Sequence, residues 1–398
     1  SARDVAIKRC FDLSIPIVLG SATPSFESMS NLSHKGYRHL TLPARVSQSV
    51  MPTLHVVDVR HQHLVAGLSP PLIERMKTFL GAGQQVLLFL NRRGYAPVMM
   101  CHHCGWTVQC QSCDAFMVWH KDSGRLHCHH CEATRPAVRV CEDCQQSELA
   151  PVGFGTQRLD EVLAELFPDI PVLRIDRDST RRKNSLRDML AEVAKQQPMI
   201  LVGTQMLVKG HHFPRLGLVA IVNADSGLFS VDFRAQERLA QQIIQVSGRA
   251  GRGDQPGQVI LQTHHPDHPL LAQLLEHGYA HFVTVSLSER KMLSLPPFSH
   301  WAVLHAEAKN QDDAVAFIEQ VMSGVQAQLD GESPVRLNGP VLAPMAKRKG
   351  FFRAQLLLAS SKRRELGAAL CLLTRSMVPT RLSRRVKWAL DVDPHELY

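Results

Sequence analysis

The sequence predicts an α/β protein: a parallel β-sheet whose chain is interrupted by a cysteine-rich metal module and followed by a small α+β domain. Strands and helices alternate over most of the chain, eight of the ten cysteines lie between Cys101 and Cys144, and the pattern of elements changes after Leu295. With 398 residues, of which 44% are hydrophobic and 20% charged, the chain is long enough for about two to four domains.

The alternating part is typical of a parallel sheet. A short apolar strand is expected at 15–20, and Thr23 and Pro24 suit the cap and first turn of a helix. The next strand is expected at 85–90, directly before the cysteines. After the cysteines we expect helices at 156–166, 179–195 and 233–248, and strands at 171–175, 199–203, 217–223 and 258–262. Helices between strands imply parallel pairing with right-handed crossovers, so the cysteine block is predicted to be an insertion in a single α/β lobe.

The segment after Leu295 has a different order of elements. A strand is expected at 301–308, two strands near 335–342 and 352–359, and a last strand at 385–392. Two helices are expected between them from apolar residues at helical spacing: Ile318, Val321, Met322, Val325 and Leu329 in the first, and Leu366, Leu370 and Leu373 in the second. The order β-α-β-β-α-β predicts a small two-layer domain of ferredoxin-like type.

Four Cys-x-x-Cys pairs make up the cysteine-rich module. Two residues between thiolates let a tight turn present both sulfurs to one tetrahedral ion, and two pairs complete a closed four-thiolate site, so the module predicts two structural zinc ions. Because an insertion must return the chain close to where it left, we expect the first and last pairs to share one ion at the neck. The expected ligands are Cys101, Cys104, Cys141 and Cys144 for the first zinc, and Cys110, Cys113, Cys128 and Cys131 for the second.

Two alternatives to this assignment stay open. Sequential pairing would join the first pair with the second and the third with the fourth, and an iron–sulfur cluster would also use four cysteines. Histidines around the cysteines are expected to be surface side chains, since eight thiolates fill both sites. Zinc modules bind protein and DNA alike, so the cysteines alone do not select a function.

Net charge and hydropathy indicate which kind of partner the chain binds. A formal net charge of +9 favours a polyanion such as nucleic acid. No charge-free apolar run reaches the ~18 residues of a membrane span, so no membrane partner is expected. Clustered cysteines are typical of a cytoplasmic metal site rather than of a secreted disulfide framework. The chain begins Ser1-Ala2 without a methionine, and we expect it to be a fragment of a longer protein.

Residues 245–253 read Gln-Val-Ser-Gly-Arg-Ala-Gly-Arg-Gly. On a helix, Gln245, Arg249 and Arg252 would share one face, and the small residues between them would let another surface come close. The planar charge of arginine suits the charge on a transferred phosphoryl group. The string resembles motif VI of superfamily 2 helicases, residues 20–25 (Gly-Ser-Ala-Thr-Pro-Ser) resemble motif III, and residues 200–210 resemble motif V.

The longer pattern resembles the PriA family of bacterial replication-restart helicases, also called primosomal protein N′. The likeness is carried by residues 87–95, which lead directly into the cysteines, and by residues 174–178, 203–214, 295–297 and 386–394. It implies a RecA-like second helicase lobe with an inserted two-zinc module, preceded by the end of lobe 1 and followed by a small α+β domain. The implied bounds are 1–50 for the end of lobe 1, 51–98 and 147–295 for lobe 2, 99–146 for the zinc insertion and 296–398 for the C-terminal domain.

The resemblance also implies a function. It implies ATP-dependent 3′ to 5′ unwinding of DNA, recognition of branched forks and single strands, and reloading of the replicative helicase with primosome proteins and single-stranded-DNA-binding protein, in the cytoplasm at the nucleoid. Arg249 and Arg252 would reach the γ-phosphate of ATP, and Gln245 would sense the nucleotide. The remaining implied motor residues are Ser21 and Thr23, which would link the lobes, and Thr204, Gln205 and Lys209, which would contact DNA or relay the ATP state.

Two departures limit the resemblance. The chain has no Gly-x-x-x-x-Gly-Lys phosphate loop and no Asp-Glu-x-His box, so ATP and Mg²⁺ are expected only in the full-length protein, and this fragment should be inactive alone. Residues 351–355 depart from the Arg-aromatic-Arg-x-Gln pattern of relatives, in a region implicated in docking single-stranded-DNA-binding protein. Asp225 would either bind a neighbouring motor group or cap a loop. The alternatives are a non-catalytic zinc-bearing DNA or protein adaptor on a degenerate motor lobe, and an RNA helicase.

Overall fold

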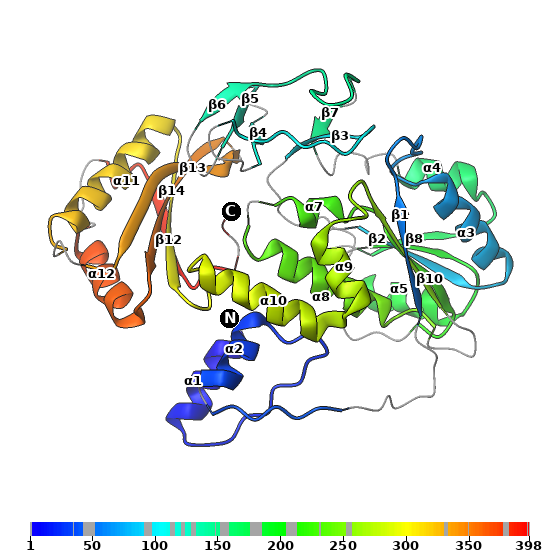
Figure 1. Ribbon diagram of the computed structural model, residues 1–398, viewed down its shortest axis with the longest axis horizontal. Coiled ribbons are helices and arrows are strands. Elements are labelled where there is room, and N and C mark those ends of the chain that lie inside the picture. Colours follow the sequence, from blue (N-terminus) through cyan, green and yellow to red (C-terminus); the bar gives the residue numbers. More distant parts are fainter. Residues whose placement is uncertain are drawn as a thin grey trace.

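The computed structural model describes residues 2–34, 36–42, 52–90, 98–111, 116–120, 124–128, 133–147, 149–151, 159–175, 185–203, 213–230, 232–251, 257–329, 333–348, 350–376, 382–395 and 397. Figure 1 shows a parallel sheet with its helices on one side, a smaller sheet with two helices on the other, and the cysteine-rich module across the top. The two N-terminal helices, α1 (Ala2–Asp12) and α2 (Phe26–His34), lie at the bottom.

The larger sheet has six strands in the order β1-β11-β10-β2-β9-β8, all parallel. Their bounds are β1 Thr53–Asp58, β2 Gln85–Phe89, β8 Val172–Ile175, β9 Ile200–Gly203, β10 Leu216–Ile221 and β11 Gln258–Thr263. Strand β2 precedes the cysteines, yet it pairs with β9 and β10, which follow them. This pairing confirms that the cysteine-rich module is inserted into the chain of a single parallel sheet.

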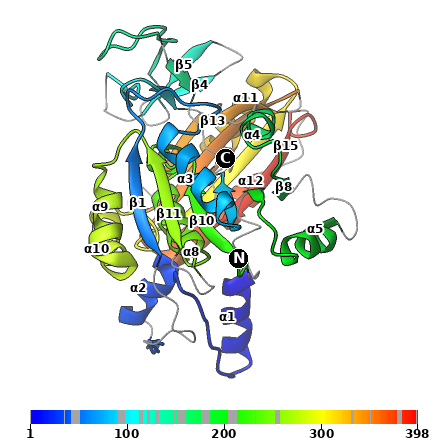
Figure 2. The same ribbon diagram turned by 90° about the vertical axis from the view of Figure 1, so that its right-hand side faces the viewer.

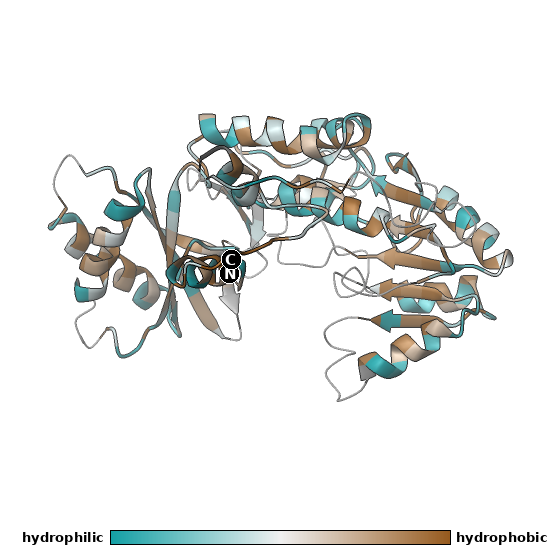
Figure 3. Ribbon diagram, turned by 90° about the horizontal axis from the view of Figure 1, so that it is seen from below, coloured by the Kyte–Doolittle hydropathy of each residue, from teal (hydrophilic) through white to brown (hydrophobic). Residues whose placement is uncertain are grey.

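Helices cover both faces of this sheet, and the alternation of side chains along β2 shows why. Val86 and Leu88 pack with α3 (Pro70–Gly81) and α4 (Leu159–Leu166), whereas Leu87 and Phe89 pack with the helices of the opposite face. Those helices are α5 (Ser185–Ala194), α8 (Ala235–Ser247), α9 (Pro269–Glu276) and α10 (Gly278–Met292). Figure 3 shows the strands coloured as hydrophobic between helices whose outer faces are hydrophilic. Burial on both faces explains the continuous apolar runs of the inner strands.

The C-terminal sheet is antiparallel, with the order β13-β14-β12-β15. Its elements are β12 His300–Ala308, α11 Gln311–Gln326, β13 Arg336–Arg348, β14 Phe351–Ser360, α12 Arg363–Ser376 and β15 Lys387–Val392. Both helices pack on one face of the sheet through a shared core that includes Phe317, Leu356 and Leu373. The predicted β-α-β-β-α-β order is confirmed.

The cysteine-rich module contains short antiparallel strands. At its neck, β3 (Met99–Cys101) pairs with β7 (Leu149–Pro151), so the two ends of the insertion lie side by side. Farther out, β4 (Val118–His120), β5 (Arg125–His127) and β6 (Thr134–Pro136) form a three-stranded sheet. Figures 1 and 2 both show the module at the end of the molecule opposite α1 and α2.

Two expectations about the N-terminal segment are wrong. Residues 15–20 form no strand, and their side chains are exposed, with Val18 at 86%. An apolar run becomes a strand only where another strand offers backbone partners, and in the described part of the chain none lies beside it. Helix α2 begins at Phe26, and Ser25 rather than Thr23 stands before it: the Ser25 hydroxyl accepts from the N–H of Ser28 at 3.3 Å.

Candidate motor and metal sites

Four of the expected zinc ligands lie together at the neck of the module. The sulfurs of Cys101, Cys104, Cys141 and Cys144 all lie within 4.8 Å of one another. Cys101 ends β3, which the return strand β7 holds beside it, and this pairing brings the first and last Cys-x-x-Cys turns together. The structure thus brings together the first and last pairs, as the topology of an insertion predicts, rather than neighbouring pairs.

The geometry of this cluster fits a tetrahedral ion. The Sγ atoms of Cys101 and Cys144 are 3.6 Å apart, as are those of Cys104 and Cys141. A zinc ion with Zn–S bonds of about 2.3 Å would separate its sulfurs by about 3.8 Å, whereas a disulfide would bring them to about 2 Å. Burial raises the pKa of the Cys101 and Cys104 thiols, so their deprotonated forms require a nearby cation. These residues fit a closed, structural metal site.

Only part of the second expected zinc site can be described. Cys110 and Cys128 are buried, at 3% and 1% exposure, in a small core with Met99, Val108 and Leu126. Cys113 and Cys131 lie outside the described residues. The four-thiolate arrangement of this second site therefore stays a prediction.

The first metal site is attached to the carboxyl end of the parallel sheet. Nδ1 of His264, directly after β11, lies 2.7 Å from the Asp225 carboxylate, and its Nε2 lies 3.1 Å from the carbonyl oxygen of His102. His102 stands between Cys101 and Cys104. Gly105 has φ +85° and passes so close that a Cβ there would lie 2.9 Å from Cβ of His264. The cysteine turn is thus fixed to the sheet through one buried histidine.

Asp225 anchors this attachment. It is 3% exposed, begins α7 (Asp225–Leu228), and accepts hydrogen bonds from the Thr263 hydroxyl and from the backbone N–H of His264 as well as from its ring. Burial by itself raises the pKa of Asp225, but the hydrogen bonds and charge of His264 and the Thr263 hydroxyl outweigh burial, and the pKa is lowered. The two interpretations of Asp225 from the sequence, a motor contact or a loop cap, both missed His264, whose position at a strand end gave no distinguishing signal.

A pocket of about 520 Å³ opens beside this attachment. It is bounded by the loop after β1, the ends of β10 and β11, and the first cysteine turn, and its lining includes His61, His103 and Asn223. Nδ1 of His61 lies 3.0 Å from Nε2 of His103, and the N–H of His61 donates to the carbonyl of His103 at 2.8 Å. The first cysteine turn therefore contacts two loops of the parallel sheet, the one after β1 and the one after β11.

The structure brings two of the expected motor residues into contact although 222 positions separate them. Nε2 of Gln245, on α8, donates to Oγ1 of Thr23 at 2.7 Å. Thr23 is buried, at 4% exposure, and its N–H donates to the Ser21 hydroxyl at 3.1 Å within the same turn. The segment that resembles motif III therefore touches the helix that leads into the segment resembling motif VI.

The expectation that Gln245, Arg249 and Arg252 share one helical face is wrong for the described part. Helix α8 ends at Ser247, Gly248 caps it, and Arg249 lies in the turn that follows, its N–H donating to the carbonyl of Val246 at 2.9 Å. Gly251, at the end of this turn, has φ +67°, in the left-handed region. Gly257 then packs against this turn, since a Cβ there would lie 2.3 Å from the nitrogen of Gly251.

Several expected residues cannot be placed. Arg252, Thr204, Gln205 and Lys209 lie outside the described residues.

Among the helices that the structure describes, none has the length and apolar character of a membrane span. Of the two cysteines outside the module, which apolar neighbours in the sequence suggest are buried, Cys371 is exposed and Cys10 half-buried.

Two family models match the chain. Residues 291–395 match the primosomal protein N C-terminal domain, and residues 110–136 match the PriA DNA helicase Cys-rich region domain. The second match begins at Cys110 and includes Cys113, Cys128 and Cys131, the four ligands expected for the second zinc. These matches support zinc binding by the module.

Curated relatives cover the whole chain. It is 47% identical to replication restart protein PriA of Haemophilus influenzae, over 100% of this chain and 54% of the relative. The proteins of the same name from Bacillus subtilis and Rickettsia felis are each 34% identical, over 99% and 100% of this chain and 49% and 61% of theirs. The chain thus spans about half the length of the curated relatives it matches. It belongs to the family of replication restart protein PriA.

Proposed function

We propose that this chain is the second motor lobe and C-terminal domain of an ATP-dependent 3′ to 5′ DNA helicase that restarts replication. Such a protein would recognise branched or stalled forks, bind the exposed single strand, and promote reloading of the replicative helicase. Its partners would be primosome proteins and single-stranded-DNA-binding protein, at the bacterial nucleoid in the cytoplasm. Membership of the replication restart family supports this role.

The observation that carries the motor part of the proposal is the hydrogen bond between Gln245 and Thr23. It joins two segments that resemble helicase motifs and lie 222 positions apart, and the turn with Arg249 directly follows the helix that makes this contact. The pair of arginines in the motif argues against an adaptor protein, which would gain nothing from arginines suited to a transferred phosphoryl group. We assign Gln245 to sensing the nucleotide through Thr23, and Arg249 and Arg252 to stabilising charge on the γ-phosphate.

Metal and nucleotide play different parts in this proposal. Two zinc ions, each held by four thiolates, would be structural, because a closed site has no open position for a substrate. ATP and Mg²⁺ would be held by a phosphate loop and an acidic pair, and this chain contains neither pattern. We therefore assign to this chain only the arginine contribution, and Thr204, Gln205 and Lys209 to DNA contact or to relaying the nucleotide state.

The test compares the chain alone with the chain joined to the upstream half found in its relatives. The chain alone should not hydrolyse ATP, and the joined protein should be a DNA-stimulated ATPase. Arg252→Ala in the joined protein should lower turnover by about 10³-fold or more, as for other arginine fingers, while nucleotide-free DNA binding is retained. Hydrolysis by the chain alone, or an Arg252→Ala protein that still unwinds forks, would contradict the proposal. A joined protein that binds DNA without hydrolysing ATP would favour the adaptor.

A further inference from the structure

Three polar side chains form a ladder along one face of α8. Glu237, Gln241 and Gln245 are spaced four residues apart, so they lie one above another on the helix. Only Gln245 belongs to the string that resembles motif VI. The other two lie one and two turns earlier, in a part of the helix to which the motif assigns no role.

The ladder is linked to a short stretch of the N-terminal segment, residues 23–26: Gln245 and Glu237 contact it directly, and Gln241 contacts it through Tyr279. Gln245 donates to the Thr23 hydroxyl, as described above. Gln241 donates to the Tyr279 hydroxyl at 3.3 Å, and that hydroxyl in turn donates to the carbonyl of Pro24 at 2.8 Å. Glu237 accepts from the N–H of Phe26 at 3.0 Å, at the first residue of α2. The helix thus contacts the segment directly at Thr23 and Phe26, and at Pro24 through Tyr279, which fixes its position along the segment.

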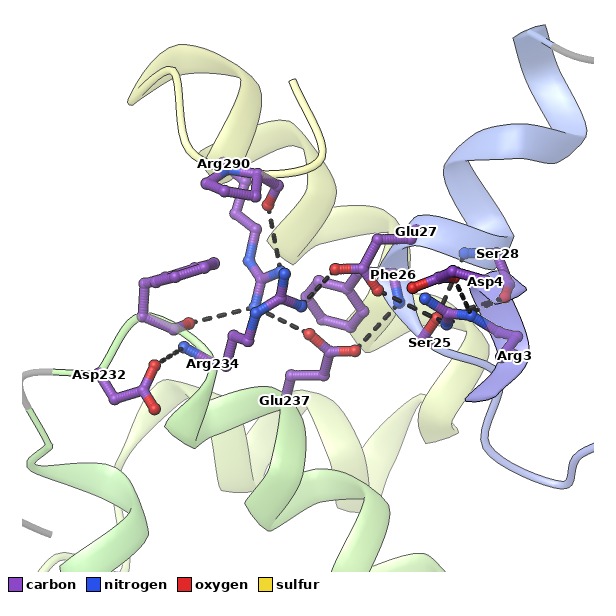
Figure 4. Close-up of polar contacts among 12 residues, drawn as sticks. Arg3, Asp4, Ser25, Phe26, Glu27, Ser28, Asp232, Arg234, Glu237 and Arg290 are labelled. Atoms are coloured by element: carbon purple, nitrogen blue, oxygen red, sulfur yellow. Dashed lines mark hydrogen bonds and ion pairs between the residues drawn. The ribbon is translucent and has the colours of Figure 1, made fainter. Parts of the chain in front are cut away.

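Glu237 is held in place by a buried arginine. Its Oε2 lies 3.0 Å from an Nη of Arg290, on α10, and the two residues are 4% and 5% exposed. The guanidinium also donates to the carbonyls of Phe233 at 3.1 Å and Pro296 at 3.2 Å. Figure 4 shows Arg290, Glu237, Phe26 and Arg234 converging between the helices. Arg290 therefore ties the ladder to the start of α8 and to the entrance of the C-terminal domain.

A second ion pair lies beside the first. Arg234 pairs with Glu27, the second residue of α2, and Arg3 lies 3.8 Å from the same carboxylate. Burial, and then the charge of Glu27, raise the pKa of Glu237, while burial lowers the pKa of Arg290. Both pKa shifts favour the neutral side chain, so burying these charges costs free energy. Packing of Phe26 against Phe282, with ring centroids 5.8 Å apart, could hold α2 without them. A buried ion pair is weak evidence for added stability, and its geometry is better explained by the position that it fixes.

We propose that Glu237, Gln241 and Tyr279 are positioning residues of the motor, which fix α8 against residues 23–26 so that Gln245 stays on Thr23 and the arginine turn stays aligned. The inference rests on the proposed function and extends it to residues outside the helicase motifs. If the inference is right, removing the contact of Glu237 with Phe26, or the link from Gln241 through Tyr279 to Pro24, should loosen the start of α2 and lower ATP turnover, although none of these side chains contacts the nucleotide in the proposed motor.

The first arm of the test uses this chain and needs no activity. Tyr279→Phe removes one hydroxyl with almost no change of shape. Glu237→Leu combined with Arg290→Met removes both buried charges together, which avoids leaving one unpaired, and also removes the acceptor for the Phe26 N–H. Amide hydrogen exchange of the segment 23–34 should become about 10- to 100-fold faster in each variant, the range expected for losing a buried hydrogen bond. Tyr37→Phe, in the same N-terminal segment but outside residues 23–26, is the matched control and should leave exchange unchanged.

The second arm uses the protein joined to its upstream half. Turnover of DNA-stimulated ATP hydrolysis should fall by about 10- to 100-fold, the range expected from small misplacement of catalytic groups, while KM for ATP changes by less than about twofold. A double variant of an exposed pair on α3, Glu74→Gln with Lys77→Met, removes an ion pair of 2.8 Å elsewhere and should leave turnover intact.

The outcomes separate the two ideas. Unchanged exchange in both variants would overturn the ladder, and faster exchange with normal turnover would overturn its positioning role. If the joined protein without substitutions hydrolyses no ATP, the proposed function fails and the positioning role fails with it. The exchange data would still show whether the ladder holds α2.

Discussion

Replacing Asp225 by alanine should loosen the attachment between the first metal site and the sheet. The carboxylate accepts from three donors, the Thr263 hydroxyl and the backbone and ring of His264, and it is 3% exposed. Removing it leaves all three donors buried without that acceptor. Breaking a buried, hydrogen-bonded charge pair costs about 3–5 kcal/mol, so the free energy of unfolding should fall by about this amount at pH 7.

The same loss should depend on pH in a definite direction. The pKa of Asp225 is lowered in the folded protein, so its carboxylate contributes stability above the usual pKa of an unfolded aspartate, about 3.9, and this contribution is lost as the pH falls through the lowered folded value. The difference between the unsubstituted and Asp225→Ala proteins should therefore shrink as the pH falls below about 4. Urea unfolding at a series of pH values measures it.

The metal site provides the local readout. His264 holds the carbonyl of His102 inside the first cysteine turn, so an unanchored His264 should let a chelator remove zinc faster from that site. Arg353→Lys, in the C-terminal domain, is the control and should leave zinc release unchanged. A destabilisation below about 1 kcal/mol at pH 7, too small for a buried charge, would refute the reasoning. So would chelation at the unsubstituted rate.

Three further predictions concern metal and glycines. Metal analysis should find two zinc ions per chain, falling to one in Cys141→Ser, because each site needs four thiolates; iron, or a single ion in the unsubstituted chain, would contradict the module. Gly105→Ala should destabilise the chain by about 1–3 kcal/mol in urea unfolding, since the new Cβ would be 2.9 Å from His264 at a left-handed φ, and Gly124→Ala, which meets no neighbour within 4 Å at φ +62°, is the control for backbone strain alone. Gly257→Ala should displace the arginine turn and lower ATP turnover of the joined protein by up to about 10²-fold. Gly81→Ala, at the end of α3 and in open space, is the steric comparison. Normal turnover in Gly257→Ala would show that the turn does not depend on this contact.

The inner strands of the fold could be predicted because they are buried on both faces. Gln85–Phe89 and Leu216–Ile221 are continuous apolar runs for that reason. Strand β1 was missed because it lies at an edge of the sheet and its residues are exposed or half-buried, so its apolar signal is weak. Residues 15–20 show the opposite error, since an apolar run identifies a strand only if a partner strand lies beside it.

The sites were predictable to different degrees. Pairing of Cys101 and Cys104 with Cys141 and Cys144 follows from topology alone, because an inserted chain must return to its start. The end of α8 could also have been predicted from the sequence. Glycine is common where helices end, and the helix stops before Gly248 and Gly251 although Gln245 and Arg249 have helical spacing. The resemblance to motif VI predicted a role for the arginines but did not use the glycines between them as a helix end.

The buried charges were the part that sequence reasoning could not reach. Glu237 and Arg290 are charged residues on helices, and such residues are usually solvated, so nothing local marks these two as buried. Their burial arises because α2 and α10 both pack beside α8, although Phe26 is 211 positions and Arg290 53 positions from Glu237. A buried charged side chain needs hydrogen-bond or ion-pair partners. Glu237 and Arg290 find them in each other and in backbone groups where α2, α8 and α10 meet.

Asp225 and Glu237 lie near the two ends of residues 225–237, and they contact different parts of the molecule. Asp225 begins α7 and holds His264 and, through it, the cysteine turn, while Glu237 lies in the first turn of α8 and holds the start of α2. The chain between them includes Phe233, whose ring packs on Trp301 of the C-terminal domain at a centroid distance of 4.8 Å. The metal module, the N-terminal segment and the C-terminal domain are therefore all fixed to the short connection that leads into the helix of Gln245. Because this connection is shared, a shift of α8 relative to residues 23–26 must be accommodated at the contacts of the other two units as well.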